Sequence, residues 1–195
     1  MRLISAAACA ISTFIPYAAN AANLVSNADF DVDTTGWSPA FPVMSIVRDG
    51  SLNAVSGTGQ GAAVVTNGGG AGFSSGVDYC VSAGIVPGGV YDLGAWILVP
   101  SGQVGTGDAS VGLYFYNAAG CTGTAVGAGS TGIALSFDTW ELKVGTSTAP
   151  ASAVSALVRL RVYSADPTPF SAAYDGARFG LTPTTPVQLQ GFNVN

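Results

Sequence analysis

Apolar and polar residues alternate most clearly in two runs near the middle of the chain. In Tyr91–Val99, the odd positions carry Tyr, Leu, Ala, Ile and Val, and the even positions are more polar. In Ala109–Tyr116, Val111, Leu113 and Phe115 alternate with small or polar residues in the same way. Because successive side chains of a strand point to opposite faces, this period of two predicts two strands whose odd positions face the core.

Shorter runs with β-like composition are spread over the rest of the chain and are separated by turns rich in Gly and Pro. They are Met44–Arg48, Ala62–Thr66, Trp140–Val144 (with Trp140 facing inward), Ala156–Tyr163 and Ala172–Leu181. Asn67–Gly76, with its many glycines, is predicted as a loop. No run has helical periodicity. The sequence therefore predicts an all-β fold, with two antiparallel sheets packed as a β-sandwich.

Asn23–Trp37 looks like the opening strand, and by pattern it pairs with Ala172–Phe179 near the other end of the chain. Asp29, Asp31 and Asp33 alternate within it, which would place three carboxylates on one side of an extended chain. The spacing fails the EF-hand pattern, which requires Gly at its sixth position and Glu at its twelfth. Two interpretations stay open: a calcium site of another type, or an acidic strand end in solvent.

Two short motifs at the start of the domain resemble the opening of carbohydrate-binding modules with the galactose-binding-like jelly-roll fold. They are Asn27-Ala28-Asp29-Phe30-Asp31 and Gly36-Trp37. Trp140 and the run 151–163 resemble later strands of these modules, and Tyr174-Asp175 resembles the start of their last strand. The chain departs from that strand at Gly176 and Ala177, where the modules commonly have an acid and a valine.

The resemblance covers most of residues 23–181 and implies a jelly-roll fold with a polysaccharide or other glycan as ligand. It also implies a structural calcium ion held by one acid from the first strand and one from the last. By motif these acids are Asp31 and Asp175, and Gly176 leaves a third common acid missing.

The first 21 residues have the features of a signal peptide: Arg2, a short apolar run and the small-x-small sequence Ala19-Asn20-Ala21. A membrane anchor is the alternative, but Pro16 and Asn20 interrupt a run that is already short for a span. We expect a signal peptide over 1–21, a β-sandwich domain over 22–181 and a Pro/Thr-rich tail over 182–195. The mature chain would then be secreted or periplasmic and would contain no membrane span.

Charged residues make up only 9% of the chain, and the net charge is −5. A chain without a basic surface is a poor ligand for nucleic acid, so we expect no such partner. Two cysteines, Cys80 and Cys121, remain after the leader, and an even number in an exported chain favours a disulfide. A reactive or metal-binding thiol is the alternative.

The sequence offers little for catalysis. It contains no His, which excludes Ser-His-Asp and Cys-His catalysis. Its one Glu, Glu141, lies in a run that resembles ordinary framework, and glycosidases usually need two carboxylates around the bond. We therefore expect no enzymatic activity.

Aromatic residues at positions facing away from the predicted core are the candidates for ligand binding. Trp96, Tyr114 and Tyr116 could stack on sugar rings, and Arg161 and Asp92 could bind hydroxyl groups. The alternative is that these rings extend the core beneath loops. A shared platform requires Tyr91–Val99 and Ala109–Tyr116 to be neighbours in one sheet.

The sequence thus predicts an exported, non-catalytic carbohydrate-binding domain. A structural or adhesive surface protein without sugar binding is the second hypothesis. Neither the glycan nor the oligomeric state follows from the sequence.

Overall fold

In a computed structural model of the chain, residues 22–54, 60–82 and 84–182 are described. The strands are β1 (Ser38–Pro39), β2 (Met44–Asp49), β3 (Ala62–Asn67), β4 (Phe73–Val81), β5 (Val90–Leu98), β6 (Gly107–Ala118), β7 (Thr122–Ser130), β8 (Glu141–Thr148), β9 (Ser155–Ser164) and β10 (Phe170–Leu181). A single 3₁₀ turn, η1 (Ala119–Cys121), separates β6 from β7. The predicted signal peptide over 1–21 lies outside the described residues, as do 183–195 of the predicted tail.

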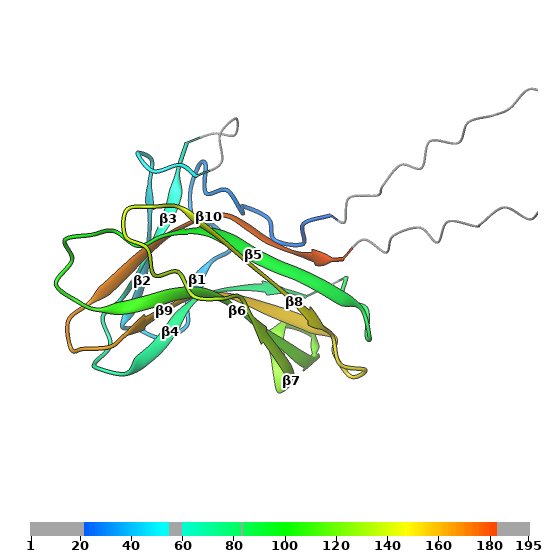
Figure 1. Cartoon of the computed structure of the whole chain (residues 1–195). Coiled ribbons are helices and arrows are strands. Elements are labelled where there is room, and N and C mark those ends of the chain that lie inside the picture. Colours follow the sequence, from blue (N-terminus) through cyan, green and yellow to red (C-terminus); the bar gives the residue numbers. More distant parts are fainter. Residues whose placement is uncertain (1–21, 55–59, 83, 183–195) are drawn as a thin grey trace, which may run out of the picture. The chain divides into compact units, whose positions relative to one another are not determined.

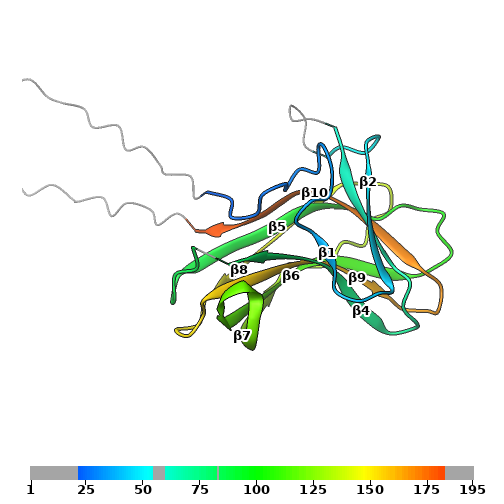
Figure 2. The same cartoon turned by 180° about the vertical axis from the view of Figure 1, so that it is seen from behind.

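The strands form two antiparallel sheets of five strands each, which confirms the predicted β-sandwich. Sheet A has the order β1-β4-β9-β6-β7, and sheet B has the order β2-β3-β10-β5-β8. Figures 1 and 2 show the two layers, with β5 and β10 in one and β6 and β9 in the other. No helix among the described residues is long and apolar enough to cross a membrane.

The core lies between the two sheets and is built from the alternating positions that the sequence predicts. Tyr91, Leu93 and Ile97 of β5 are fully buried, as are Leu113 and Phe115 of β6. Tyr91 also stacks on Phe179 of β10, with ring centroids 4.9 Å apart. Burying apolar side chains of this size stabilises by roughly 1.5–3 kcal/mol each, so these strands anchor both sheets.

The segment predicted as the opening strand does not form a strand, but it does bind the partner segment that was predicted for it. No residue of 23–37 belongs to a regular strand. Yet the main chain of Leu24 donates to Phe179 O at 2.7 Å, and Ala177 donates to Ala28 O at 2.9 Å. Phe30 and Trp37 are both buried in the core. The segment therefore joins the two ends of the domain without continuous pairing.

Besides the two-residue β1, two strands of sheet A, β4 and β7, were missed. The predicted loop Asn67–Gly76 includes the start of β4, which pairs with β9 along its whole length. A Cβ at Gly76 would lie 2.0 Å from Leu160 O, so glycine there permits a close strand approach. β7 is an edge strand of small, mostly exposed residues. Neither strand has the apolar alternation on which the prediction rests.

The predicted position of Trp140 is wrong. It was predicted to face inward on a strand, but β8 begins at Glu141 and Trp140 is only half-buried. The predicted register of Leu142 and Val144 is also reversed, because both side chains are exposed on the outer face.

Two buried serines differ in hydrogen bonding and give a matched stability prediction. Among the described residues, Ser75 has the one buried side-chain oxygen without a hydrogen-bond partner. The Ser155 hydroxyl instead donates to Ala118 O at 2.6 Å and accepts from Cys121 N at 3.0 Å. Ser75→Ala should therefore raise the free energy of unfolding by about 1 kcal/mol, and Ser155→Ala should lower it by about 1–2 kcal/mol. Urea unfolding of the two variants measures both; equal destabilisation would contradict the assignment.

Candidate functional site

Polar and aromatic side chains gather on the outer face of sheet A, at the even positions of β4 and β6 and the odd positions of β9. We call this the arginine face; its residues are Asp78, Asp108, Tyr114, Arg159, Arg161 and Tyr163. The register places them together, because Arg159 lies opposite Asp78 on one side and Gly112 on the other. Each of these side chains is half-buried, so each remains accessible.

The first group on this face joins three strands. Arg159 Nε donates to Asp78 Oδ1 at 2.6 Å, and Arg159 Nη2 donates to Asp78 Oδ2 at 2.8 Å. The guanidinium carbon lies 5.2 Å from the centroid of the Tyr114 ring. The hydrogen bond to Asp78 raises the pKa of the Arg159 guanidinium, so the cation is fixed in charge and orientation.

A second group of the same composition lies farther along β9. Arg161 Nη1 donates to Asp108 Oδ1 at 2.8 Å, and Arg161 Nε donates to Ser74 Oγ at 2.7 Å. Its guanidinium carbon lies 5.8 Å from the centroid of the Tyr163 ring. The face thus carries two arginines, each held by an aspartate of a neighbouring strand and each next to a tyrosine ring.

Gly112 separates the two groups on β6. A Cβ built there would lie 3.7 Å from Tyr114 Cε2 and 3.8 Å from Arg159 Cβ, which is ordinary van der Waals contact. Gly112 itself is buried, and a side chain at this position would touch Tyr114 and Arg159 without a backbone clash.

The topology separates the predicted aromatic residues. Tyr114, Tyr116 and Arg161 lie on sheet A, whereas Trp96 lies on the outer side of sheet B because β5 and β6 belong to different sheets. Asp92 is also on sheet B, where Thr182 Oγ1 donates to its Oδ1 at 3.1 Å. A single platform containing Trp96 and the two tyrosines is therefore wrong, because chain connectivity does not decide which sheet a strand joins.

Sequence reasoning missed four of the residues on the arginine face. Arg159 shares the alternation that predicted the direction of Arg161, so that signal was present. Tyr163 is two residues after Arg161, so the same alternation places it on the same face. Asp78 lies on the unpredicted β4, and Asp108 precedes the predicted start of its strand.

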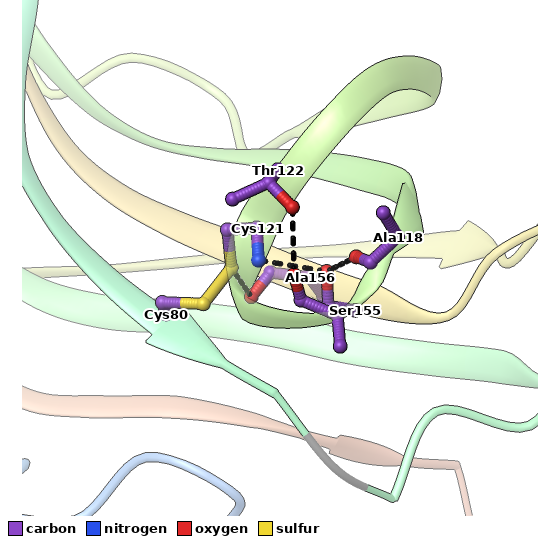
Figure 3. Close-up of a disulfide and its surroundings, with 7 residues drawn as sticks. Cys80, Ala118, Cys121, Thr122, Ser155 and Ala156 are labelled. Atoms are coloured by element: carbon purple, nitrogen blue, oxygen red, sulfur yellow. Dashed lines mark hydrogen bonds between the residues drawn. A yellow bond between two sulfur atoms is a disulfide. The ribbon is translucent and has the colours of Figure 1, made fainter.

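The predicted disulfide between Cys80 and Cys121 is present, with Cα atoms 5.9 Å apart. Cys80 lies on β4, opposite Leu157 of β9, which in turn lies opposite Tyr114. The bond therefore brings η1 back across β9 at the Tyr114 end of the arginine face. Figure 3 shows the Ser155 hydroxyl between Ala118 and Cys121, which fixes the same turn against β9.

The predicted calcium ligands lie near a third acid. Burial raises the pKa of Asp29, and the negative charges of Asp175 and Asp31 raise it further, so Asp29 lies within electrostatic range of both predicted ligands. Asp175 is buried and accepts hydrogen bonds from Ala54 N and Gly176 N, at 2.8 and 2.7 Å.

Other features at this place fit a calcium ion less well. Among the described residues, no group of three or more acidic or cysteine side chains is placed to hold a metal. Arg48 donates to the carbonyl groups of Phe30, Asp31 and Gln60, so a cationic side chain already holds oxygens of this segment. The carboxylates fit a hard cation, whereas these carbonyl groups are already engaged.

Comparison with known proteins yields structural similarity alone. No protein-family model matches the chain, and no curated protein matches it by sequence. Among solved structures, the chain is similar to the CBM22-1 xylan-binding domain of Paenibacillus barcinonensis Xyn10C, with a TM-score of 0.59 and 14% identity, covering 85% of this chain and 97% of that one. It is also similar to the C-terminal family 22 carbohydrate-binding module of Clostridium thermocellum Xyn10B, with a TM-score of 0.56 and 18% identity, covering 83% and 98%.

The chain has the jelly-roll fold of these carbohydrate-binding modules. The predicted resemblance is thereby confirmed at the level of fold. Larger proteins contain the same fold as one part of their chain. One example is the bacteriophage CBA120 tailspike protein 4 enzymatically active domain, with a TM-score of 0.61 and 14% identity. The match covers 82% of this chain and 21% of that one.

Proposed function

We propose that this chain is a carbohydrate-binding domain without catalytic activity, and that its glycan lies on the arginine face. The observation that carries the proposal is the repeated group of tyrosine, arginine and aspartate on the outer side of sheet A. Sugar rings present apolar C–H faces that pack on aromatic rings, and their hydroxyl groups need polar partners. Both kinds of group stand side by side here.

The arginines retain donors for a ligand. A guanidinium has five N–H groups. Arg159 uses two of them for Asp78, and Arg161 uses three for Asp108, Ser74 and Ser110. The remaining N–H groups are held in place by these bonds, so a glycan could bind them with little loss of side-chain freedom.

The solved domains suggest which glycan to test first. Two of the similar structures are described as xylan-binding domains. A β-linked polysaccharide such as xylan is therefore the first ligand to test, and a broad glycan array should accompany it.

The chemistry of the acids supports binding without catalysis. The hydrogen bond from Lys143, with those from the main chain of Ser136 and Leu135, lowers the pKa of Glu141 to about 2, so this carboxylate is unsuited to act as a general acid. Asp78 and Asp108 are each paired with an arginine. We further propose that the chain is exported, since a leader sequence and a disulfide both belong to extracytoplasmic proteins.

Tyr114→Ala should weaken binding of an array hit by about 1–2 kcal/mol, or roughly fivefold to thirtyfold, because the ring is lost as a stacking surface. Calorimetric titration measures this. The matched control is Trp96→Ala, which removes a half-buried ring on the opposite sheet and should leave the affinity unchanged. The reverse result, with Trp96→Ala weakening binding and Tyr114→Ala having no effect, would place the site on sheet B. No binding across the array would favour the structural or adhesive hypothesis.

We also propose a test of the structural calcium ion. If calcium binds between Asp31 and Asp175 in the folded state only, excess calcium should raise the melting temperature, and Asp31→Asn should remove the increase. Asp33→Asn is the control, because Asp33 is an exposed acid of the same segment whose carboxylate accepts from Thr35 N at 2.8 Å. An unchanged melting temperature after chelation and readdition of calcium would show that the ion is absent.

A further inference from the structure

Strand β8 forms an unprotected edge of sheet B. Its pairing with β5 runs without interruption from Thr148, opposite Val90, to Glu141, opposite Ile97. Within the described residues, the main-chain groups of β8 make no hydrogen bonds beyond this ladder. One side of an eight-residue strand therefore presents its free N–H and C=O groups outward.

The other three sheet edges are shorter or irregular. β1 has two residues and includes Pro39. The pairing of β7 with β6 contains register shifts, and irregular edges of this kind hinder further pairing. β2 has six residues and ends with the charged Arg48 and Asp49. β8 is therefore the edge best suited to extend a sheet.

Exposed apolar side chains gather beside this edge. Leu142 and Val144 point outward from β8, and Ile133, Leu135 and Phe137 lie in the segment just before it. That segment is held next to β8, because Leu135 N and Ser136 N donate to Glu141 Oε1 at 3.0 and 2.8 Å. We call these five exposed residues and the free side of β8 the β8 edge surface. A group of this kind marks an interaction site.

The charges on β8 do not protect it. A lysine on an edge strand usually prevents pairing, but Lys143 Nζ lies 2.7 Å from Glu141 Oε2 within the same strand. The rest of β8 after Val144 is Gly, Thr, Ser and Thr, which are small and uncharged. The edge is therefore nearly neutral as a whole.

We propose that β8 pairs in antiparallel orientation with β8 of a second copy of this chain, joining two B sheets into one. An edge strand is self-complementary about a two-fold axis, because each copy supplies the donors and acceptors that the other lacks. If the two-fold axis passes at Val144, this side chain lies opposite the partner's Val144, and Leu142 lies opposite the partner's Thr146. The exposed apolar side chains of the two copies then meet on the outer face. The arginine face belongs to the other sheet, so it stays exposed in the dimer.

Sedimentation velocity of the full chain from micromolar to near-millimolar concentration tests the proposal. The wild type should reach twice the chain mass, and Val144→Lys should remain a monomer because two ammonium groups would meet at the axis. The matched control is Val47→Lys on β2, which changes an exposed valine at the opposite edge of the same sheet. This variant should still form the dimer.

A second pair of variants keeps the proposal testable if Val144→Lys fails to fold. Under mild oxidation, Val144→Cys should form an intermolecular disulfide, whereas Val47→Cys should not. A wild type that stays monomeric at every concentration would overturn the proposal and leave β8 as an edge for a different protein. A dimer that Val144→Lys leaves intact, or equal cross-linking of the two cysteine variants, would also overturn it.

Discussion

Replacing both cysteines of the Cys80–Cys121 disulfide with alanine should lower the free energy of unfolding by about 4 kcal/mol. The bond closes a loop of 41 residues, and in the chain-entropy model a loop of this length restricts the unfolded chain by that amount. Denaturant unfolding of the oxidised wild type and the Cys80→Ala/Cys121→Ala variant measures the difference.

Reduced wild type is the natural control for this double variant, because it loses the cross-link without losing the side chains. The two proteins should be destabilised to a similar extent. A loss below about 1 kcal/mol in both would contradict this account and would indicate that the unfolded chain is already restricted in the same region.

Gly112→Val should abolish most glycan binding, lowering the affinity by about tenfold or more, while the fold remains intact. Position 112 lies on a central strand, opposite Arg159 and Ser130, and a Cβ there meets its neighbours at ordinary contact distance. Valine suits a strand, so its added methyl groups should fill the space beside Tyr114 rather than distort the sheet. Calorimetric titration measures the affinity, and thermal unfolding should show little change in stability.

Gly76→Ala is the contrasting variant on the same face. Its Cβ would meet Leu160 O at 2.0 Å, so the variant should be destabilised by about 3 kcal/mol through distortion of the pairing of β4 with β9. If Gly112→Val bound the glycan as tightly as the wild type, the ligand would not lie beside Tyr114.

The sandwich could be predicted from sequence wherever one face of a strand is buried. The alternation in β5, β6 and β9 identified their buried faces, because apolar burial imposes a period of two. β4 and β7 escaped prediction because Gly, Ser and Thr occupy many of their positions. Their pairing depends on neighbours that are distant in the sequence.

The site could be predicted only in part, for a similar reason. Tyr114 and Arg161 were correctly placed on faces away from the core, because that follows from local alternation. Trp96 was grouped with Tyr114, since two strands joined by one loop are equally compatible with one sheet or two. The pairing of Arg159 with Asp78 joins residues 81 positions apart, which no local pattern reveals.

The most direct test of the arginine face as a glycan site is two-dimensional NMR of the isotopically labelled protein, titrated with a glycan identified on the array. We predict that chemical-shift changes will concentrate on β4, β9 and β6, with the side-chain signals of Arg159 and Arg161 among the largest. Changes centred on β5 and β8 around Trp96, with the signals of β9 unmoved, would contradict the central claim.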